Sequence, residues 1–294
     1  MSRPSQPPAS VALPLAVVTV LAATLLSATG AAAAAGPGGT PDRGATTYVA
    51  MGDSFAAGNG TGLPDLDPAC RRSSLAYAPI VAAERERTDL AFVACSGATT
   101  RTVLDTQVAA LDRGTDFVTL SVGGNDIGLG PIARACVLGT EAQCLGVAAQ
   151  ATAFTTAEMP GRLDAVYAAV GDRVRKAEVV VVGYPRFFAE NFVPCQNAFG
   201  ITATEAAALN DLVDTLDAVA ADRAAAAGFT YVSTVDAFTG HDICAPDPWV
   251  NGIIAPTQFD AYHPSVAGYR DGYAPLVAAE LETRRPSVSR APAA

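Results

Sequence analysis

In the stretch Tyr48-Val49-Ala50-Met51-Gly52-Asp53-Ser54-Phe55, an apolar run stops at a glycine, and an acid and a serine follow at once. This pattern predicts a buried strand that ends in a tight turn and carries a serine hydroxyl beyond the edge of a sheet. Taken alone, a serine after a strand is more typical of a turn or a helix cap than of a nucleophile. A catalytic role for Ser54 therefore depends on what the rest of the chain supplies.

Five apolar runs alternate with helical patterns along the chain. The runs are continuous rather than alternating in polarity, which is typical of strands buried on both faces of a parallel sheet. They cover residues 48–52, 90–94, 117–122, 178–185 and 229–235, and helices are expected over 73–87, 107–111, 147–170, 202–227 and 265–284. The expected helix caps are Ser73 or Ser74, Thr202 and Ser265, and the segment that holds Cys136 and Cys144 is expected to be a loop. We therefore expect a three-layer α/β/α sandwich of the flavodoxin-like kind, with one five-stranded, mainly parallel sheet.

Residues with useful chemistry follow four of these runs. Ser54 follows the first run, Gly97 the second, Asn125 the third and His263 the fifth. In an open parallel sheet, active residues gather in the crevice beyond the carboxyl ends of the strands. We therefore expect these four residues to lie together, although they are far apart in the sequence.

A serine needs a base to become a nucleophile at neutral pH, and the chain has only two histidines. His263 precedes Pro264 and a predicted helix, so it is the candidate base, and His241 is interpreted as a structural residue of another loop. Asp260 lies three residues before His263 and can reach the Nδ1 atom of the imidazole within one turn. A backbone carbonyl in the same place could orient the ring almost as well.

Acyl transfer through a serine would also need hydrogen-bond donors for the oxyanion of the tetrahedral intermediate, and loss of one donor typically costs about 3–4 kcal/mol of activation free energy. The candidates are the backbone N–H groups of Ser54 and Gly97 and the side-chain amide of Asn125. Glycine lets the chain approach a substrate closely. Glycine and asparagine are also common in ordinary turns, so the argument rests on their placement after successive strands.

The first 35 residues have the layout of a secretory signal peptide. Arg3 gives a weakly positive start, residues 11–26 are apolar and uncharged, and Ala33-Ala34-Ala35 offers a cleavage site. An uncleaved membrane anchor is the alternative, but the apolar run is short for a span and contains Pro14. The expected organisation is a signal peptide over 1–35 cleaved near Ala35, a flexible linker over 36–47, one catalytic domain over 48–284 and a disordered tail over 285–294.

The net charge limits the partners of the mature protein. Removing residues 1–35 takes away one basic residue and no acid, which leaves 18 basic against 29 acidic residues and a net charge of −11. An acidic surface argues against nucleic acid and against electrostatic docking on anionic membranes. No later segment is apolar enough for a membrane span, so we expect a secreted, soluble monomer without a stable membrane anchor.

All six cysteines, at positions 70, 95, 136, 144, 195 and 244, follow the predicted signal peptide. An even count in an exported protein indicates three disulfides, although the count does not choose among the possible pairings. A zinc site is disfavoured because there is no C-x-x-C motif. No phosphate-binding or dinucleotide-binding loop follows the first run, so we expect no cofactor and no metal.

Four blocks of the sequence, taken together, resemble the SGNH (GDSL) hydrolases. The blocks are Gly52-Asp53-Ser54, Gly97, Gly123-Gly124-Asn125-Asp126 and Asp260-x-x-His263-Pro264, in that order. The six cysteines and the segment from Gly240 to Gly252 are similar to the secreted actinomycete lipase and esterase branch of the family. The G-x-S-x-G elbow of other α/β-hydrolases is absent.

The resemblance implies a secreted serine ester hydrolase, which could be a lipase, an esterase or an enzyme of the phospholipase A type. It implies an acyl-enzyme on Ser54, with His263 as general base. It implies oxyanion donors at Ser54, Gly97 and Asn125. In this branch the third triad member is sometimes a main-chain carbonyl, so that group and the Asp260 side chain are both candidates. The implied disulfides are Cys70–Cys95, Cys136–Cys144 and Cys195–Cys244.

The substrate is expected to be a lipid or another acyl ester, and two alternatives stay open. A carbohydrate acetyl esterase could use the same fold and site. A secreted binding protein with an inactive site is the other alternative, but such a protein should have lost at least one of the four site residues. Several phenylalanines could line an acyl groove or pack in the core: Phe55, Phe187, Phe188, Phe192 and Phe199.

Overall fold

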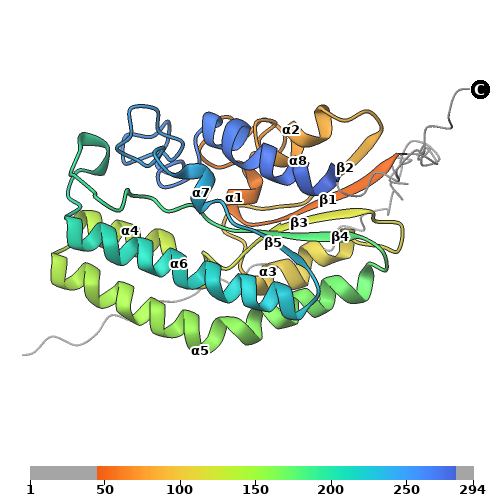
Figure 1. Ribbon diagram of the computed structural model, residues 1–294, viewed down its shortest axis with the longest axis horizontal. Helices are drawn as coiled ribbons and strands as arrows, with labels where there is room; N and C mark the ends of the chain where they lie inside the picture. The colour runs from red at the N-terminus through yellow and green to blue at the C-terminus, as the bar shows by residue number, and fades with distance from the viewer. Residues whose placement is uncertain (1–44, 283–294) are drawn as a thin grey trace, which may run out of the picture. The chain divides into compact units, whose positions relative to one another are not determined.

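The computed structural model describes residues 45–282, which contain one five-stranded sheet (Figure 1). The strands pair in parallel in the order β2-β1-β3-β4-β5, so their carboxyl ends share one edge. Every residue of β3 is buried, as expected for a strand covered on both faces. The strands are β1 (Thr46–Gly52), β2 (Thr88–Phe92), β3 (Phe117–Ser121), β4 (Glu178–Val182) and β5 (Thr230–Val232).

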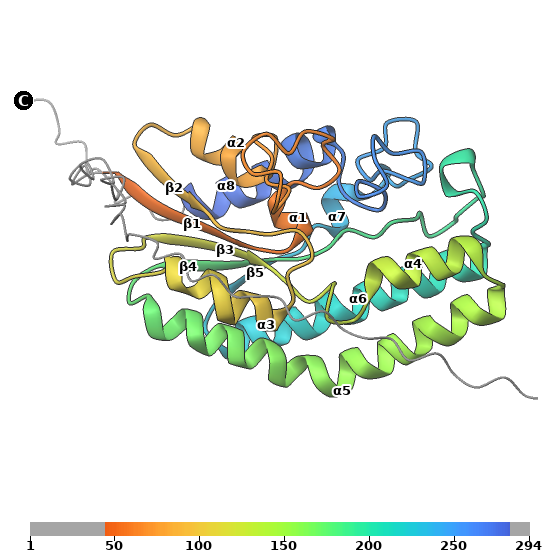
Figure 2. The same cartoon turned by 180° about the vertical axis from the view of Figure 1, so that it is seen from behind.

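Helices cover both faces of the sheet, which confirms the predicted α/β/α sandwich. The helical elements are α1 (Ser54–Ala57), α2 (Tyr77–Ala83), α3 (Thr100–Thr102), η1 (Val103–Gln107), η2 (Val108–Ala110), α4 (Leu129–Leu138), α5 (Glu141–Arg173), η3 (Gln196–Ala198), α6 (Ala203–Ala226), α7 (Val235–Phe238), η4 (Gly268–Tyr273) and α8 (Ala274–Glu282). The two opposite views place α2 and α8 on one face and α3, α5 and α6 on the other (Figure 1 and Figure 2). None of the helices within residues 45–282 is both long enough and apolar enough to cross a membrane.

The two long helices begin at capping boxes, of which only the one at Thr202 lies at a predicted cap. The predicted cap Thr202 accepts a hydrogen bond from the backbone of Glu205, and the Glu205 side chain accepts one from the backbone of Thr202. Thr140 and Gln143 make the same exchange at the start of α5. The prediction for α6 is therefore correct at its start, whereas α5 begins six residues before the predicted position 147.

Two segments predicted to be loops or helices differ in the structure. The segment holding Cys136 and Cys144 was expected to be a loop, but it is helical, with Cys136 in α4 and Cys144 in α5. The helix predicted from Ser73 begins only at Tyr77. The Ser73 hydroxyl instead accepts hydrogen bonds from the Leu75 backbone and the Thr61 hydroxyl, so this serine stabilises a loop.

The described residues begin within the predicted linker and end before the predicted tail. β1 begins at Thr46, so two residues of the linker expected over 36–47 belong to the sheet. The predicted signal peptide (1–35) and tail (285–294) lie outside the described residues. At the last helix, Ser265 accepts a hydrogen bond from the backbone of Gly268, as expected of a cap.

Three disulfides connect loops and helices around the sheet. The structure joins Cys70 to Cys95, Cys136 to Cys144 and Cys195 to Cys244, which are the pairs implied by the family resemblance. The first ties the loop after α1 to the loop after β2. The third ties the loop after β4 to the loop after α7. Two of the three therefore join loops that extend from the carboxyl edge of the sheet.

Candidate active site

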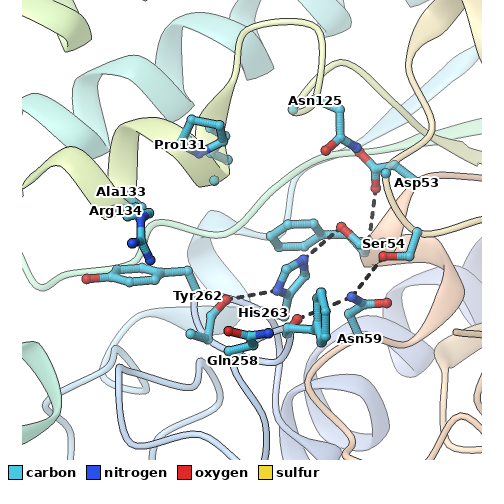
Figure 3. Close-up of a pocket in the computed structure, with 18 of the residues that line it drawn as sticks. Asp53, Ser54, Asn59, Asn125, Pro131, Ala133, Arg134, Gln258, Tyr262 and His263 are labelled. Carbon is cyan, nitrogen blue, oxygen red and sulfur yellow. Dashed lines mark hydrogen bonds between the residues drawn. The ribbon is translucent and has the colours of Figure 1, made fainter. Parts of the chain in front are cut away.

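A cavity of about 760 Å³ opens beyond the carboxyl edge of the sheet (Figure 3). The structure brings four sequence-predicted residues to its wall: Ser54, Gly97, Asn125 and His263. Their elements are α1, the loop after β2, the loop after β3 and the loop before the last helix. The four residues therefore lie together at one edge of the sheet, as predicted.

A tight turn between β1 and α1 carries Ser54. Gly52 has a φ of +130°, and a Cβ atom there would lie 2.2 Å from the carbonyl oxygen of Ser121, so only glycine fits. Asp53 caps α1 by accepting a hydrogen bond from the Phe55 backbone at 2.9 Å. Ser54 follows as the first residue of α1 and is 7% exposed at the cavity wall.

A second contact fixes the end of β1, and the sequence did not indicate it. The Gln107 side chain accepts a hydrogen bond from the Gly52 N–H at 2.7 Å and donates one to the Gly52 carbonyl at 2.9 Å. This pair imitates the ladder of another strand. Gln107 is buried at the end of the π-helical turn η1, whose irregular geometry directs the amide to the strand.

The two ring nitrogens of His263 have different partners. Nε2 lies 2.7 Å from the Ser54 hydroxyl oxygen, and Nδ1 lies 2.9 Å from the carbonyl oxygen of Ala261. A carbonyl only accepts, so Nδ1 carries the hydrogen, and Nε2 is left as the acceptor for the serine proton. Loss of solvation around the ring lowers the pKa of His263 to about 4, although the Ala261 contact opposes the shift. The imidazole is therefore neutral at pH 7.

The structure does not pair Asp260 with His263, which corrects that predicted assignment. The Asp260 carboxylate accepts hydrogen bonds from the Gly60 backbone at 2.9 Å and the Thr257 hydroxyl at 2.6 Å, and Arg71 lies 3.3 Å away. Burial by itself would raise the pKa of this carboxyl, but these contacts outweigh it and lower the pKa. Nδ1 of His263 is hydrogen-bonded to the Ala261 carbonyl, so the predicted alternative, a backbone carbonyl that orients the ring, is the arrangement in the structure.

The candidate oxyanion donors lie on separate turns. Gly97 is exposed with a φ of +82°, and no atom lies within 4 Å of the position that a Cβ would take. Neither its N–H nor that of Ser54 has an acceptor within residues 45–282. The Asn125 amide donates one hydrogen to the carbonyl oxygen of Ala98 at 3.0 Å and keeps a second. These groups can therefore donate to an incoming oxyanion without breaking a backbone ladder.

Tyr184 is a further site residue that sequence reasoning missed. Its hydroxyl donates to the Asp53 carboxylate at 2.7 Å and accepts from the Gly124 N–H at 3.2 Å, so it joins the Ser54 turn to the Asn125 loop. Burial raises the pKa of Asp53 to about 7, against the lowering effect of the Tyr184 bond. The only signal in the sequence was the position of Tyr184 near the end of the fourth apolar run.

The predicted phenylalanine groove is partly present. Phe55 and Phe187 line the cavity, Phe188 and Phe192 are buried in the core, and Phe199 is 73% exposed. Other apolar groups complete the wall: Leu129, Pro131, Ala133, Val137, Leu138, Ile253 and Phe259. His241 does not line the cavity; it stacks on Trp249 at 3.8 Å between ring centroids, in keeping with a structural role.

Known proteins share both the sequence pattern and the architecture. A model of the GDSL-like lipase/acylhydrolase family matches residues 50–270. Lipase 1 of Streptomyces coelicolor is 39% identical over 231 residues, which cover 78% of this chain and 85% of that protein. A solved structure of phospholipase A1 from Streptomyces albidoflavus is 41% identical, with a TM-score of 0.76 over 80% of this chain and 99% of the other.

A solved extracellular lipase from Streptomyces rimosus is also similar, at 37% identity and a TM-score of 0.75, over 80% of this chain and 100% of that one. The family match begins within β1, ends within η4 and includes Ser54, Gly97, Asn125 and His263. The resemblance drawn from the four sequence blocks is thereby confirmed. The chain belongs to the GDSL-like lipase/acylhydrolase family and is an esterase or lipase of that family.

Proposed function

We propose that this enzyme cleaves acyl esters through an acyl-enzyme on Ser54, with His263 as the general base. The observation that carries the proposal is the pair of contacts on His263, at 2.7 Å to the Ser54 hydroxyl and 2.9 Å to the Ala261 carbonyl. A nucleophile within hydrogen-bond reach of a base, and a base oriented by a third group, are the features of an activated serine. Here the third group is a backbone carbonyl.

The reaction has two halves. Ser54 Oγ attacks the ester carbonyl carbon while Nε2 of His263 takes the hydroxyl proton, and the tetrahedral intermediate places its negative charge near the N–H groups of Ser54 and Gly97 and the Asn125 amide. The intermediate collapses, the C–O bond to the alcohol breaks, and His263 protonates the departing alkoxide. Water then attacks the acyl-enzyme by the same route and releases the carboxylic acid.

The Ala261 carbonyl holds the tautomer and stabilises the positive imidazolium by its dipole rather than by a full charge. It therefore gives less electrostatic help than a carboxylate would. We propose that Asp260 acts on this arrangement indirectly, by fixing the turn that carries Ala261, through its bonds to Gly60 and Thr257.

We propose lipid esters as the substrate class. The apolar cavity wall suits an acyl chain, which gains free energy as its methylene groups leave water. The lipase and phospholipase A1 named among the relatives favour the same class. A polysaccharide acetyl esterase is less well supported, because a sugar chain needs polar partners along the groove.

We propose that the protein is exported, with cleavage of the signal peptide near Ala35, and acts as a soluble monomer without nucleic-acid partners or a membrane anchor. The sequence layout of residues 1–35, three disulfides and the acidic charge support this proposal. The extracellular lipase from Streptomyces rimosus supports it as well.

Replacement of the two reacting side chains tests the mechanism. Ser54→Ala and His263→Ala are each expected to lower kcat on a p-nitrophenyl ester by about 10⁴-fold or more, because one lacks the attacking oxygen and the other lacks the base. His241→Ala serves as the matched histidine control and should keep the kcat of the unmodified enzyme. Wild-type rates in Ser54→Ala or His263→Ala, with the fold intact by circular dichroism, would refute the proposal.

A further inference from the structure

The proposed mechanism requires three loops to keep their relative positions, and one buried residue contacts all of them through its backbone and its side chain. Asn59 lies just beyond α1, on the cavity wall, and is 3% exposed. Its backbone N–H donates to the carbonyl oxygen of Ser54 at 3.0 Å, and its own carbonyl accepts from the Tyr269 hydroxyl at 2.8 Å. The backbone of this residue is therefore fixed between the proposed nucleophile and the last helix.

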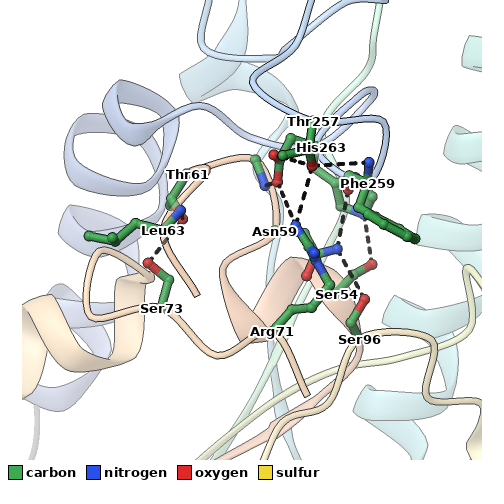
Figure 4. Close-up of polar contacts among 12 residues, drawn as sticks. Ser54, Asn59, Thr61, Leu63, Arg71, Ser73, Ser96, Thr257, Phe259 and His263 are labelled. Atoms are coloured by element: carbon green, nitrogen blue, oxygen red, sulfur yellow. Dashed lines mark hydrogen bonds and ion pairs between the residues drawn. The ribbon is translucent and has the colours of Figure 1, made fainter. Parts of the chain in front are cut away.

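The side-chain amide of Asn59 connects the other two loops (Figure 4). Its nitrogen donates to the Ser96 hydroxyl at 3.0 Å and to the backbone carbonyl of Phe259 at 3.2 Å. Ser96 precedes Gly97, the proposed oxyanion donor, and Phe259 lies two residues before Ala261. The partners are 37 and 200 positions away from Asn59 in the sequence, so no local structure sets these contacts.

We propose that Asn59 is a positioning residue, which couples the oxyanion loop and the His263 loop to the nucleophile turn; this inference rests on the proposed function. The chemistry requires an amide because the Nδ2 atom supplies two hydrogens from one point. Serine or threonine has one hydrogen, and a carboxylate has none. Misplacement of catalytic groups by about 1 Å can cost about 100-fold in rate, so a bond between these loops bears directly on kcat.

Asn59→Asp is the most informative variant because it keeps the shape of the side chain. An oxygen then faces the Phe259 carbonyl, so the contact to the His263 loop becomes repulsive, while Ser96 can turn its hydroxyl to donate to the carboxylate. We expect a fall in kcat of about 10- to 100-fold with KM changed by less than about twofold. The melting temperature should fall by about 2–4 °C, as for one lost buried hydrogen bond.

Ser96→Ala separates the second contact, because it removes the acceptor on the oxyanion loop and leaves the Phe259 contact. We expect a smaller loss in kcat for Ser96→Ala than for Asn59→Asp. The double variant Asn59→Ala/Ser96→Ala should lose no more kcat than Asn59→Ala alone, because Asn59→Ala already removes the bond to Ser96. Asn210→Asp is the matched control: this buried asparagine donates to the backbone carbonyl of Phe188 at 2.8 Å and does not line the cavity. It should lower the melting temperature and leave kcat unchanged.

The readouts separate this inference from the proposed function. Hydrolysis by the unmodified enzyme and its loss in Ser54→Ala test the function itself. If those results hold, a wild-type kcat in both Asn59→Asp and Ser96→Ala would overturn the positioning role. A loss of kcat in Asn210→Asp equal to that in Asn59→Asp would also overturn it, because the effect would then follow from lost stability alone.

Discussion

At the scale of single residues, the site relies on a neutral imidazole oriented by a backbone carbonyl. His263 contacts Ser54 through one nitrogen and Ala261 through the other, and no carboxylate within residues 45–282 hydrogen-bonds to the ring. The contacts of Asp260 lie on the other side of its turn, with Gly60, Thr257 and Arg71. The ring is partly withdrawn from water, so its protonated form is disfavoured.

The environment of His263 determines the pH dependence that we expect for kcat/KM. The proposed base must be neutral to accept the Ser54 proton, and the pKa of His263 is lowered to about 4. Protonation of His263 should therefore lower activity as the pH decreases through about 4, rather than through the ordinary histidine range near 6.5. Measuring kcat/KM on a soluble ester from roughly pH 3.5 to 8 checks this. An acidic limb centred near 6.5 would contradict it.

At the scale of elements, the loops of the site are attached to one another by side-chain hydrogen bonds. The loop over residues 257–263 approaches the loop over 59–62 through the Asp260 carboxylate, and Arg71 of a third loop places its guanidinium 4.6 Å from the centre of the Phe259 ring. Tyr184 joins the Ser54 turn to the Asn125 loop in the same way. The strand ends thus bring the loops to one edge of the sheet, and side-chain contacts between the loops fix the positions of the site residues.

The Asp260 contacts allow a test of that view. Asp260→Ala removes the bonds to Gly60 and Thr257 but leaves the Ala261 carbonyl in the chain, so the turn loosens without losing the group that orients His263. We expect kcat to fall by about tenfold, compared with about 10⁴-fold where a true orienting acid is disabled. Asn at this position should recover part of the loss, because its oxygen can still accept from Gly60. A loss in kcat on the order of several thousandfold would instead identify Asp260 as the triad acid.

At the scale of the whole molecule, disulfides connect the loops of the functional edge. Cys70–Cys95 joins the loop of Arg71 to the loop of Gly97, and Cys195–Cys244 joins the loops after β4 and α7. Cys136–Cys144 joins α4 to α5 and closes a loop of only 8 residues. The covalent constraint is therefore greatest on the side of the sheet where the proposed chemistry takes place.

Their loop lengths predict unequal contributions to stability. The bridge of sequence separation 49 should contribute about 4 kcal/mol and the bridge of separation 8 about 2.5 kcal/mol, because longer loops lose more entropy in the unfolded chain. Replacing Cys195 and Cys244 by alanine should thus lower the melting temperature by about 3–6 °C more than replacing Cys136 and Cys144. Scanning calorimetry of the two double variants provides the comparison. Equal melting temperatures would count against this chain-entropy account.

Sequence patterns predicted the architecture well and its details less well. Continuous apolar runs identified all five strands of the described region, and the Thr202 capping signal identified the start of α6. The helical segment around Cys136 and Cys144 was missed, because disulfide-bearing segments with several glycines have weak helical patterns. The helix start at Ser73 was wrong, because a serine that caps a helix and one that bonds within a loop have the same local signature.

The sequence by itself determined the parallel sheet and the gathering of Ser54, Gly97, Asn125 and His263, because the carboxyl ends of parallel strands share an edge whatever the loops do. Only the tertiary structure decided that Ala261 rather than Asp260 contacts the imidazole, and that Asn59 lies between three loops. Periodicity is a property of neighbouring residues, whereas a hydrogen bond such as that from Asn59 to Phe259, 200 positions away, depends on how separate loops pack. The sequence therefore indicated where the site forms, and packing decided which atoms meet there.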